Sequence, residues 1–185
     1  DHGSLFDFYS KHGKRFDMRT AWRLAKECAQ GFDVIHDLGF MHRDIKSLNV
    51  FLSGDFVAKV ADFGMCTNER TSTAACGTVQ WMAPEVLTNL YGGRMMYDKR
   101  VDVYSYGILL HEIFYCTCPY METGLDQMSL GRRVLQQNIR PDLRRRSCPS
   151  QVQDVIKKCW DKNPAARPSF KQVNELLLGV QSVCS

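Results

Sequence analysis

The sequence predicts a mainly α-helical domain with a small β-hairpin region. Apolar residues recur at three- and four-residue steps between positions 18 and 35, which is the period of one buried helix face. Residues 101–114 are almost wholly apolar, as expected for a helix that is buried on every side. Between these segments, two short apolar runs flank the turn signal Ser53-Gly54-Asp55, a pattern typical of a hairpin.

Composition indicates one globular domain. The chain has 185 residues, of which 44% are hydrophobic and 24% are charged, so it can bury a sizeable core and is not a disordered chain. The formal net charge of +4 comes from 24 Lys and Arg against 20 Asp and Glu. This surplus is too small to indicate nucleic-acid or membrane binding. The basic run at 144–146 is expected to be a solvated loop.

The cysteine pattern and the apolar runs bear on the compartment. The eight cysteines lack the short regular spacing of a disulfide framework, so we expect reduced thiols. Cys116 and Cys118 form one C-x-C without a second pair, which does not indicate a structural zinc site. No signal segment is visible, and the apolar run at 108–110 is followed by His111 and Glu112. We therefore expect a cytoplasmic protein without a membrane span.

The first half of the chain contains the first predicted helix and the hairpin. One apolar helix face is formed by Met18, Ala21, Trp22, Ala25, Cys28, Ala29, Phe32 and Ile35. Gly39 is expected to end this helix. The hairpin strands are predicted at 50–52 and 57–61.

The second half is predicted to be helical after a loop. Residues 66–76 lose all periodicity, as in a mobile surface loop. Pro119 is expected to stop the apolar helix at 101–114, and a helical region is expected near 125–137. S-x-x-Q capping boxes that begin at Ser150 and Ser169 predict two late helices. Without an internal repeat or linker, the chain is interpreted as one domain at 1–180 followed by a tail at 181–185.

Three motifs carry the chemistry. The stretch MHRDIKSLNVF at 41–51 sets five polar or charged groups between two apolar runs, and a purely structural segment would have little use for them. Asp62-Phe63-Gly64 follows the hairpin, and Ala83-Pro84-Glu85 follows the loop. Each motif alone is a weak signal. In this chain order and at this spacing, the set resembles the signature of eukaryotic protein kinases.

The resemblance covers nearly the whole chain and implies the fold of the family's larger, C-terminal lobe. It extends to Asp102, to Cys159-Trp160 and to Arg167-Pro168, where that lobe carries similar residues. Glu85 and Arg167 resemble the family's long-range ion pair, in which a carboxylate and a guanidinium are buried together.

The family resemblance implies phosphoryl transfer from ATP to a protein hydroxyl, which requires a positioned acceptor and neutralised phosphate charge. Asp44 would accept the proton of that hydroxyl. Lys46 lies two positions on in an extended loop, so its ammonium would reach the transferring phosphate. Asn49 and Asp62 would hold magnesium through side-chain oxygens and, with Lys46, contact the nucleotide.

Each of these four residues also has a purely structural interpretation. Asp44 fits a turn, Lys46 a surface charge, Asn49 an Asx-turn and Asp62 a cap. Their occurrence together in one loop-and-hairpin unit favours the site.

Further residues receive roles from the resemblance. His42 and Phe63 would stack in the interior beneath the site, and Asp102 would hold the loop backbone. Gly64 is assigned a structural role together with these residues. Phe51 resembles the position that forms the floor under the adenine ring, although a buried strand aromatic would look the same in the sequence.

Residues 62–85 resemble the activation segment, and its candidate phosphate acceptors are Thr67, Thr71, Ser72 and Thr73, hydroxyls that a polar solvated loop would also carry. A phosphate on Thr71, Ser72 or Thr73 would pair with Arg43 and order the loop, which would make an upstream kinase a partner.

The substrate class is predicted from two positions. Lys46 looks like the residue that serine/threonine kinases carry at this spacing, and so does Thr78 within the run GTVQWMAPE at 77–85. Thr78 is also assigned a regulatory role, together with Arg43, Thr71, Ser72 and Thr73. This run, together with KSLN at 46–49, is most similar to the tyrosine-kinase-like group, which includes the Raf and mixed-lineage kinases.

One departure from the family is large. The opening DHGSL resembles the segment just after the family's hinge, so the smaller, N-terminal lobe is missing. No G-x-G-x-x-G loop or V-A-I-K lysine occurs, and Gly92-Gly93 has neither the spacing nor the strand to replace that loop. We therefore expect very poor phosphate transfer by the chain alone and an exposed apolar seam where the other lobe docks.

Two alternatives belong to other classes. The chain could be a catalytically silent scaffold or regulatory domain, against which the intact Asp44, Asn49 and Asp62 argue. It could also be a small-molecule phosphotransferase of the aminoglycoside or choline kinase type, which shares a histidine-aspartate-asparagine loop. Asp62-Phe63-Gly64, the Ala-Pro-Glu motif and Arg167 argue against that class.

Overall fold

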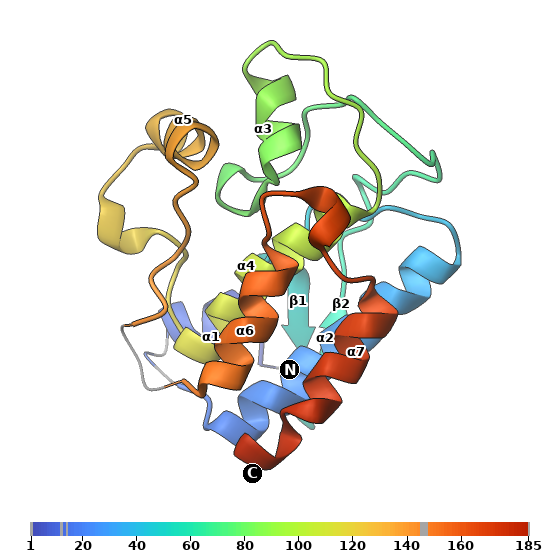
Figure 1. The fold of residues 1–185 in the computed structure, drawn as a ribbon. Helices are drawn as coiled ribbons and strands as arrows, with labels where there is room; N and C mark the ends of the chain where they lie inside the picture. The colour runs from blue at the N-terminus through green and yellow to red at the C-terminus, as the bar shows by residue number, and fades with distance from the viewer. Residues whose placement is uncertain (1, 12, 14, 145–147, 185) are drawn as a thin grey trace.

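The computed structural model describes residues 2–11, 13, 15–144 and 148–184, and it confirms the predicted mainly helical fold with one small hairpin (Figure 1). The helices and strands are α1 (Leu5–Ser10), α2 (Met18–Asp37), β1 (Val50–Leu52), β2 (Ala58–Val60), α3 (Pro84–Leu90), α4 (Arg100–Tyr115), α5 (Gln127–Gln137), α6 (Ser150–Cys159) and α7 (Phe170–Gly179). Short 3-10 turns include η1 (Ser47–Asn49), η2 (Val79–Trp81) and η5 (Gln181–Val183). Most of the predicted basic run at 144–146 lies outside the described residues.

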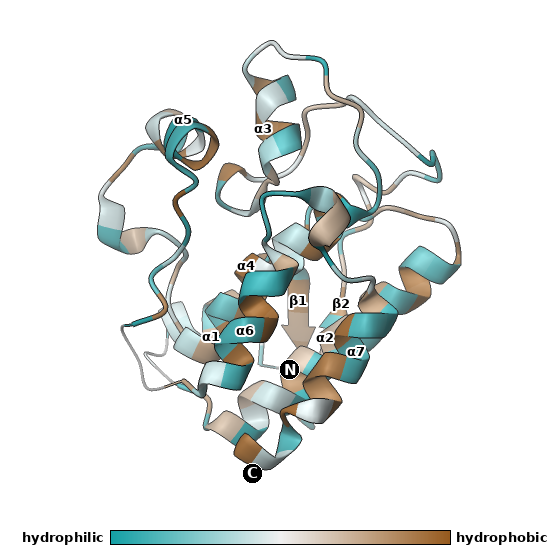
Figure 2. Ribbon diagram, in the orientation of Figure 1, coloured by the Kyte–Doolittle hydropathy of each residue, from teal (hydrophilic) through white to brown (hydrophobic). Residues whose placement is uncertain are grey.

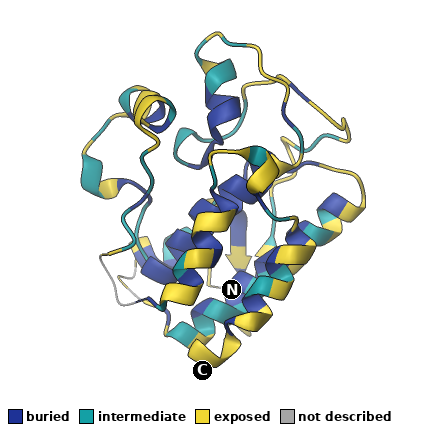
Figure 3. Ribbon diagram, in the orientation of Figure 1, coloured by how far each residue is buried: buried dark blue, intermediate teal, exposed yellow. Residues whose placement is uncertain are grey.

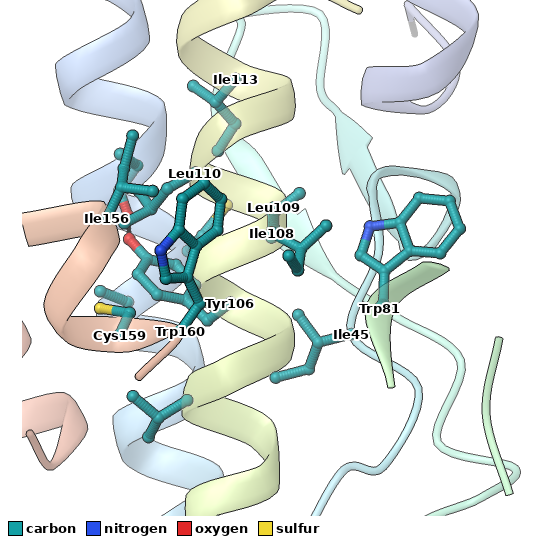
Figure 4. Packing of buried hydrophobic residues seen from close by; sticks show 14 of the residues in the cluster. Ile45, Trp81, Tyr106, Ile108, Leu109, Leu110, Ile113, Ile156, Cys159 and Trp160 are labelled. Atoms are coloured by element: carbon teal, nitrogen blue, oxygen red, sulfur yellow. Dashed lines mark hydrogen bonds between the residues drawn. The ribbon is translucent and has the colours of Figure 1, made fainter. Parts of the chain in front are cut away.

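Helix α4 is the centre of the fold, as its apolar sequence predicts. All of its residues from 101 to 115 are buried (Figure 3). Figure 4 shows Cys159 and Trp160 on one side of α4 and Ile45 and Trp81 on the other. Gly107 permits this packing, because a Cβ there would lie 3.0 Å from the Trp160 backbone nitrogen. The apolar helix is therefore the scaffold against which the other elements pack.

The outer helices are amphipathic and turn one apolar stripe inward (Figure 2). The predicted face of α2 is confirmed, since Ala25, Cys28 and Phe32 are fully buried or nearly so. Helix α2 packs against α7, and Trp22 donates a hydrogen bond from Nε1 to the Leu177 carbonyl at 2.7 Å. Burial raises the pKa of Cys159 to about 12, so this core thiol stays protonated.

The hairpin pairs its strands antiparallel, with Val50 opposite Val60 and Leu52 opposite Ala58. Residues before α1 extend the pairing, because the Leu52 amide donates to the Gly3 carbonyl at 2.9 Å. Strand β1 alternates buried, exposed, buried, which turns Phe51 to the solvent. The hairpin thus closes one side of the loop at 41–49.

The helix ends agree with the sequence in part. Gly39 follows α2 with φ of 83°, a conformation that glycine adopts at little cost. Helix α4 ends at Cys116, whose left-handed φ of 50° breaks the helix before Pro119 is reached. The helix thus ends one residue beyond the predicted span of 101–114, and Pro119 is not the residue that ends it.

One capping box is confirmed and the other is wrong. The Ser169 side chain accepts from the Gln172 backbone N–H, and the Gln172 side chain reaches back to the Ser169 amide. In α6 the N-cap is Pro149, and Ser150 is the first helical residue. Gln153 instead donates to the Cys148 carbonyl at 3.0 Å, so α6 begins without a side-chain cap.

The loop at 66–76 is irregular, as expected, and it has two isolated bridges to the rest of the molecule. The short helices α1 and α3 were not predicted. Of the helices that the structure describes, none combines the length and apolar character needed to cross a bilayer.

Candidate active site

Four of the predicted residues meet at the loop between α2 and β1. Lys46 donates from Nζ to Asp44 Oδ2 at 2.6 Å and to Thr78 Oγ1 at 2.9 Å. Thr78 Oγ1 in turn donates to Asp44 Oδ1 at 3.0 Å. The Asn49 amide donates to the Asp44 carbonyl oxygen at 2.9 Å and to its Oδ2 at 3.1 Å. The Asp44 carboxylate is therefore oriented by three side chains.

The hairpin brings Asp62 to the same edge as Asn49. The Ala61 amide donates to the Asn49 carbonyl at 2.9 Å, so Asp62 follows the residue that pairs with Asn49. Asp62 is exposed and has a left-handed φ of 62°, and its Oδ1 accepts from the Gly64 amide at 3.3 Å. Because both amide hydrogens of Asn49 face Asp44, its amide oxygen points away. A carboxylate and an amide oxygen on one edge fit the hard-oxygen preference of magnesium.

Asp102 at the start of α4 holds the loop backbone, as predicted. Its Oδ2 accepts from the His42 amide at 2.7 Å and from His36 Nε2 at 2.8 Å, and its Oδ1 accepts from the Arg43 amide at 2.8 Å. Arg43 has a left-handed φ of 67°, which costs free energy for a non-glycine residue. Asp102 keeps Arg43 in this conformation and so sets the direction in which Asp44 leaves the loop.

Gly77 lets the segment that contains Thr78 approach the loop. It has φ of 107°, and a Cβ there would lie 2.7 Å from the Arg43 carbonyl oxygen. Only a glycine fits a conformation and a contact of this kind. The contact places Thr78 within hydrogen-bonding distance of Asp44.

Glu85 and Arg167 form the predicted buried ion pair. The guanidinium donates from Nη1 to Glu85 Oε1 at 2.6 Å and from Nη2 to Oε2 at 3.0 Å, a bidentate arrangement. Arg167 also donates to the carbonyls of Asp161 and Arg100, and it lies over the Tyr104 ring. This ion pair ties α3 to the segment before α7.

Comparison with protein families matches residues 1–177 to a model described as protein tyrosine and serine/threonine kinase. The chain belongs to the protein kinase family. The family predicted from the motifs at 42–49, 62–64 and 83–85 is therefore confirmed. Members of this kinase family generally use ATP and magnesium.

Curated relatives agree with this family. The serine/threonine-protein kinase STY17 of Arabidopsis thaliana is 35% identical over 178 residues, which is 95% of this chain and 30% of that protein. The serine/threonine/tyrosine-protein kinase HT1 of the same plant is 36% identical over 163 residues, with 86% and 40% covered. A probable serine/threonine-protein kinase of Dictyostelium discoideum is 35% identical over 178 residues, with 95% and 19% covered. The kinase chain thus spans well under half the length of these relatives.

The predicted interior stack of the kinase chain is only half correct. His42 is fully buried, and its ring lies 5.6 Å from that of Phe32 in α2. Phe63 was expected in the interior, and this is wrong, because 54% of the residue is exposed. His42 already occupies the inner position, so Phe63 lies outside it with ring centroids 5.7 Å apart.

Phe51 is 47% exposed on β1, so it is not the buried strand aromatic that the sequence left open. Its partner in the ladder is Lys59. Phe51 and Phe63 are two large apolar side chains with about half of their surface in solvent.

The candidate acceptors of the activation segment differ in accessibility. Thr71 and Thr73 are exposed, whereas Ser72 is 8% exposed and its Oγ accepts from the Ala74 amide at 3.2 Å. Thr67 pairs with Met41 through two backbone hydrogen bonds. Arg43 donates from Nε to the Met65 carbonyl at 2.6 Å, inside the same segment.

Sequence reasoning missed a buried carboxyl group in this kinase lobe, Glu112 of α4. Its Oε1 accepts from the hydroxyls of Tyr9 and Ser47, and its Oε2 accepts from Trp81 Nε1 at 2.7 Å and from the Ser47 amide at 3.2 Å. Burial raises the pKa of Glu112 to about 7, although these hydrogen bonds oppose the shift. The signal was present, since His111 and Glu112 interrupt an otherwise apolar helix.

Proposed function

We propose that this chain is the C-terminal lobe of a protein serine/threonine kinase of the tyrosine-kinase-like group. The hydrogen-bonded set of Asp44, Lys46, Asn49 and Thr78 carries the proposal, because it combines a general base, a cation and a hydroxyl at one point. The serine/threonine kinases among the relatives support the choice of acceptor.

Asp44 is assigned the role of base. Its carboxylate would accept the proton of a substrate serine or threonine hydroxyl as that oxygen bonds to the γ-phosphorus of ATP. The bond from this phosphorus to the β,γ-bridging oxygen would break, and ADP would leave. Lys46 already lies 2.6 Å from this carboxylate, and its ammonium offsets negative charge on the transferring group. Thr78 holds both side chains and in this way orients the acceptor.

Asn49 and Asp62 are assigned to magnesium, and Lys46, Asn49, Phe51 and Asp62 to the nucleotide. A magnesium ion there would neutralise phosphate charge during transfer. The exposed ring of Phe51 offers an apolar face for a purine. Since the sequence contains no glycine-rich phosphate loop, we expect the chain alone to transfer phosphate poorly.

The proposed partners are a protein substrate and an upstream kinase. A phosphate on Thr71 or Thr73 would lie in the segment that Arg43 already contacts through Met65. Intact-mass measurement before and after phosphatase treatment tests this regulation, because an active preparation without phosphate would contradict it.

The test of function is transfer of labelled phosphate from ATP to a generic basic protein. The chain is compared with a version extended by a kinase N-terminal lobe, and each is made with Asp44→Asn and with Asp55→Asn. Asp55 is an exposed aspartate in the hairpin turn and serves as the matched control. We expect transfer by the extended version to fall by a factor of about 1,000 or more in Asp44→Asn, in line with loss of a general base and its positioning, and to persist in Asp55→Asn.

A folded extended version that binds magnesium and ATP yet transfers nothing would contradict the proposal. That outcome would favour a silent, kinase-like scaffold. Equal activity of Asp44→Asn and the parent would instead reject the role of Asp44 alone.

A further inference from the structure

Tyr97 lies in the linker between α3 and α4, outside the activation segment, yet it pairs with that segment. The Ser72 amide donates to the Tyr97 carbonyl and the Tyr97 amide donates to the Ser72 carbonyl, both at 2.9 Å. Tyr97 is 4% exposed. A large side chain is therefore buried under a loop that has no regular secondary structure.

The phenol of Tyr97 makes a second attachment. Its hydroxyl donates to the Ala74 carbonyl at 2.7 Å. Cys76 Sγ lies 3.9 Å from the hydroxyl oxygen of Tyr97. Burial raises the pKa of the Tyr97 phenol. The hydroxyl thus stays protonated and donates to the segment.

Tyr97 also borders the catalytic residues. It lines a small cavity together with Arg43, Asp44, Cys76 and Thr78. Arg43 is held at its amide by Asp102 and at Nε by the Met65 carbonyl. Tyr97 therefore borders the same cavity as Arg43, whose amide and Nε are bonded to other groups of the chain.

We propose that Tyr97 is a positioning residue that orders residues 72–76 in the absence of a phosphate. The hydroxyl supplies a donor to the segment, and its ring fills the space beneath the loop. Any effect of Tyr97 on phosphoryl transfer rests on the proposed function, whereas its effect on the order of residues 72–76 does not.

The contacts of Tyr97 restrict which hydroxyls of the segment a kinase could phosphorylate. Phosphorylation of Ser72 requires its bridge to Tyr97 to open, because the Ser72 hydroxyl is buried and bonded to the Ala74 amide. Thr71 and Thr73 are exposed on either side and need no such opening. A phosphate on Thr71 or Thr73 would add a contact to a segment that the hydrogen bonds of Tyr97 already hold in place.

The test is amide hydrogen exchange of the chain, freed of phosphate and checked by intact mass, with neither nucleotide nor substrate present. Tyr97→Phe removes only the hydroxyl. The matched control is Tyr91→Phe, which removes a hydroxyl that donates to the Met128 carbonyl at 2.9 Å, on α5. We expect exchange at the amides of Ser72 and Ala74 to rise about five- to tenfold in Tyr97→Phe, the effect of one lost hydrogen bond, and to stay unchanged in Tyr91→Phe.

Unchanged exchange in Tyr97→Phe would overturn the proposal. A Tyr97→Phe chain that no longer folds would overturn it as well, because the phenol would then hold the whole fold and not the segment. Rapid, loop-like exchange of Ser72 and Ala74 in the parent chain would contradict it without any variant. None of these results depends on catalysis, so a failure of the proposed kinase activity would be seen separately.

Discussion

The buried ion pair of Glu85 and Arg167 shows how a single residue supports the fold. Their side chains are 5% and 0% exposed, and the guanidinium has further carbonyl partners at Asp161 and Arg100. Removal of a partner from such a pair leaves a charge in a medium that solvates it poorly. Removal of Arg167 is therefore expected to lower the free energy of unfolding by more than the loss of its hydrogen bonds, because the Glu85 charge stays buried.

We expect Arg167→Ala to lower the free energy of unfolding by about 3 kcal/mol or more, because the buried Glu85 carboxylate loses the guanidinium that binds it through two hydrogen bonds. Thermal and urea unfolding measure this change. Arg100→Ala is the control, since its pair with Asp98 is exposed on both sides, and we expect a loss of less than about 1 kcal/mol. Equal effects of the two substitutions would contradict the buried pair.

Residue roles were predictable where the chemistry depends on local spacing. Asp44, Lys46 and Asn49 lie within six positions, so their meeting follows from one loop. Glu112 was missed because its partners Tyr9 and Trp81 come from distant parts of the chain. Only the three-dimensional packing brings these donors to one carboxyl group.

At the scale of elements, the beginning of a helix depends on a few backbone N–H groups. Ser169 satisfies one of them in α7 by accepting from the Gln172 amide. In α6 the residue in the same sequence pattern, Ser150, donates to the Gln151 side chain at 3.2 Å. The pattern S-x-x-Q therefore marks a helix in both cases and a cap in only one.

We expect Ser169→Ala to lower the free energy of unfolding by about 1 kcal/mol, through the loss of this cap. Ser150→Ala is the matched control and should change it by less than about 0.5 kcal/mol, because the Ser150 side chain does not cap α6. Urea unfolding of both variants is the measurement. A larger loss in Ser150→Ala than in Ser169→Ala would contradict the assignment.

Long elements with a clear period were predictable, and short ones were not. Helix α2 has 20 residues and α4 has 16, so several turns repeat the same pattern. Helices α1 and α3 have six and seven residues, fewer than two full turns. Their start signals are local, a capping box of Ser4 and Asp7 in α1 and Pro84 at the start of α3, but so few turns give no repeating apolar pattern to support them.

At the scale of the whole molecule, Glu112 joins parts that are far apart in the chain. It accepts from α1 through Tyr9, from η1 through Ser47 and from η2 through Trp81. Two of its donors are rotatable hydroxyls on Oε1, so the carboxyl group can keep its partners in either protonation state. The stability of the fold should therefore respond to pH through this residue.

The pKa of Glu112 rises from 4.5 to about 7 on folding, so the folded state holds its proton more tightly than the unfolded state. Stability from this source is fully present below pH 4.5 and is lost as pH rises through about 7. We expect a loss of about 3 kcal/mol across this window and a flatter profile in Glu112→Gln, measured by urea unfolding. Glu175→Gln, at an exposed glutamate of α7, should keep the parent profile. A parent profile that rises over this window would contradict the expectation.

The position of Asp102 in the chain has a consequence for biosynthesis. A ribosome makes His42 and Arg43 long before the Asp102 carboxylate that accepts from their amides, and the apolar surface of α2 is made long before α4 covers part of it. The nascent first half therefore cannot complete its core or its catalytic loop, and it must leave the ribosome with apolar surface unburied. The apolar faces of α2 and α4 are fully covered only when α6 and α7, which pack on α4 and α2, have also been made.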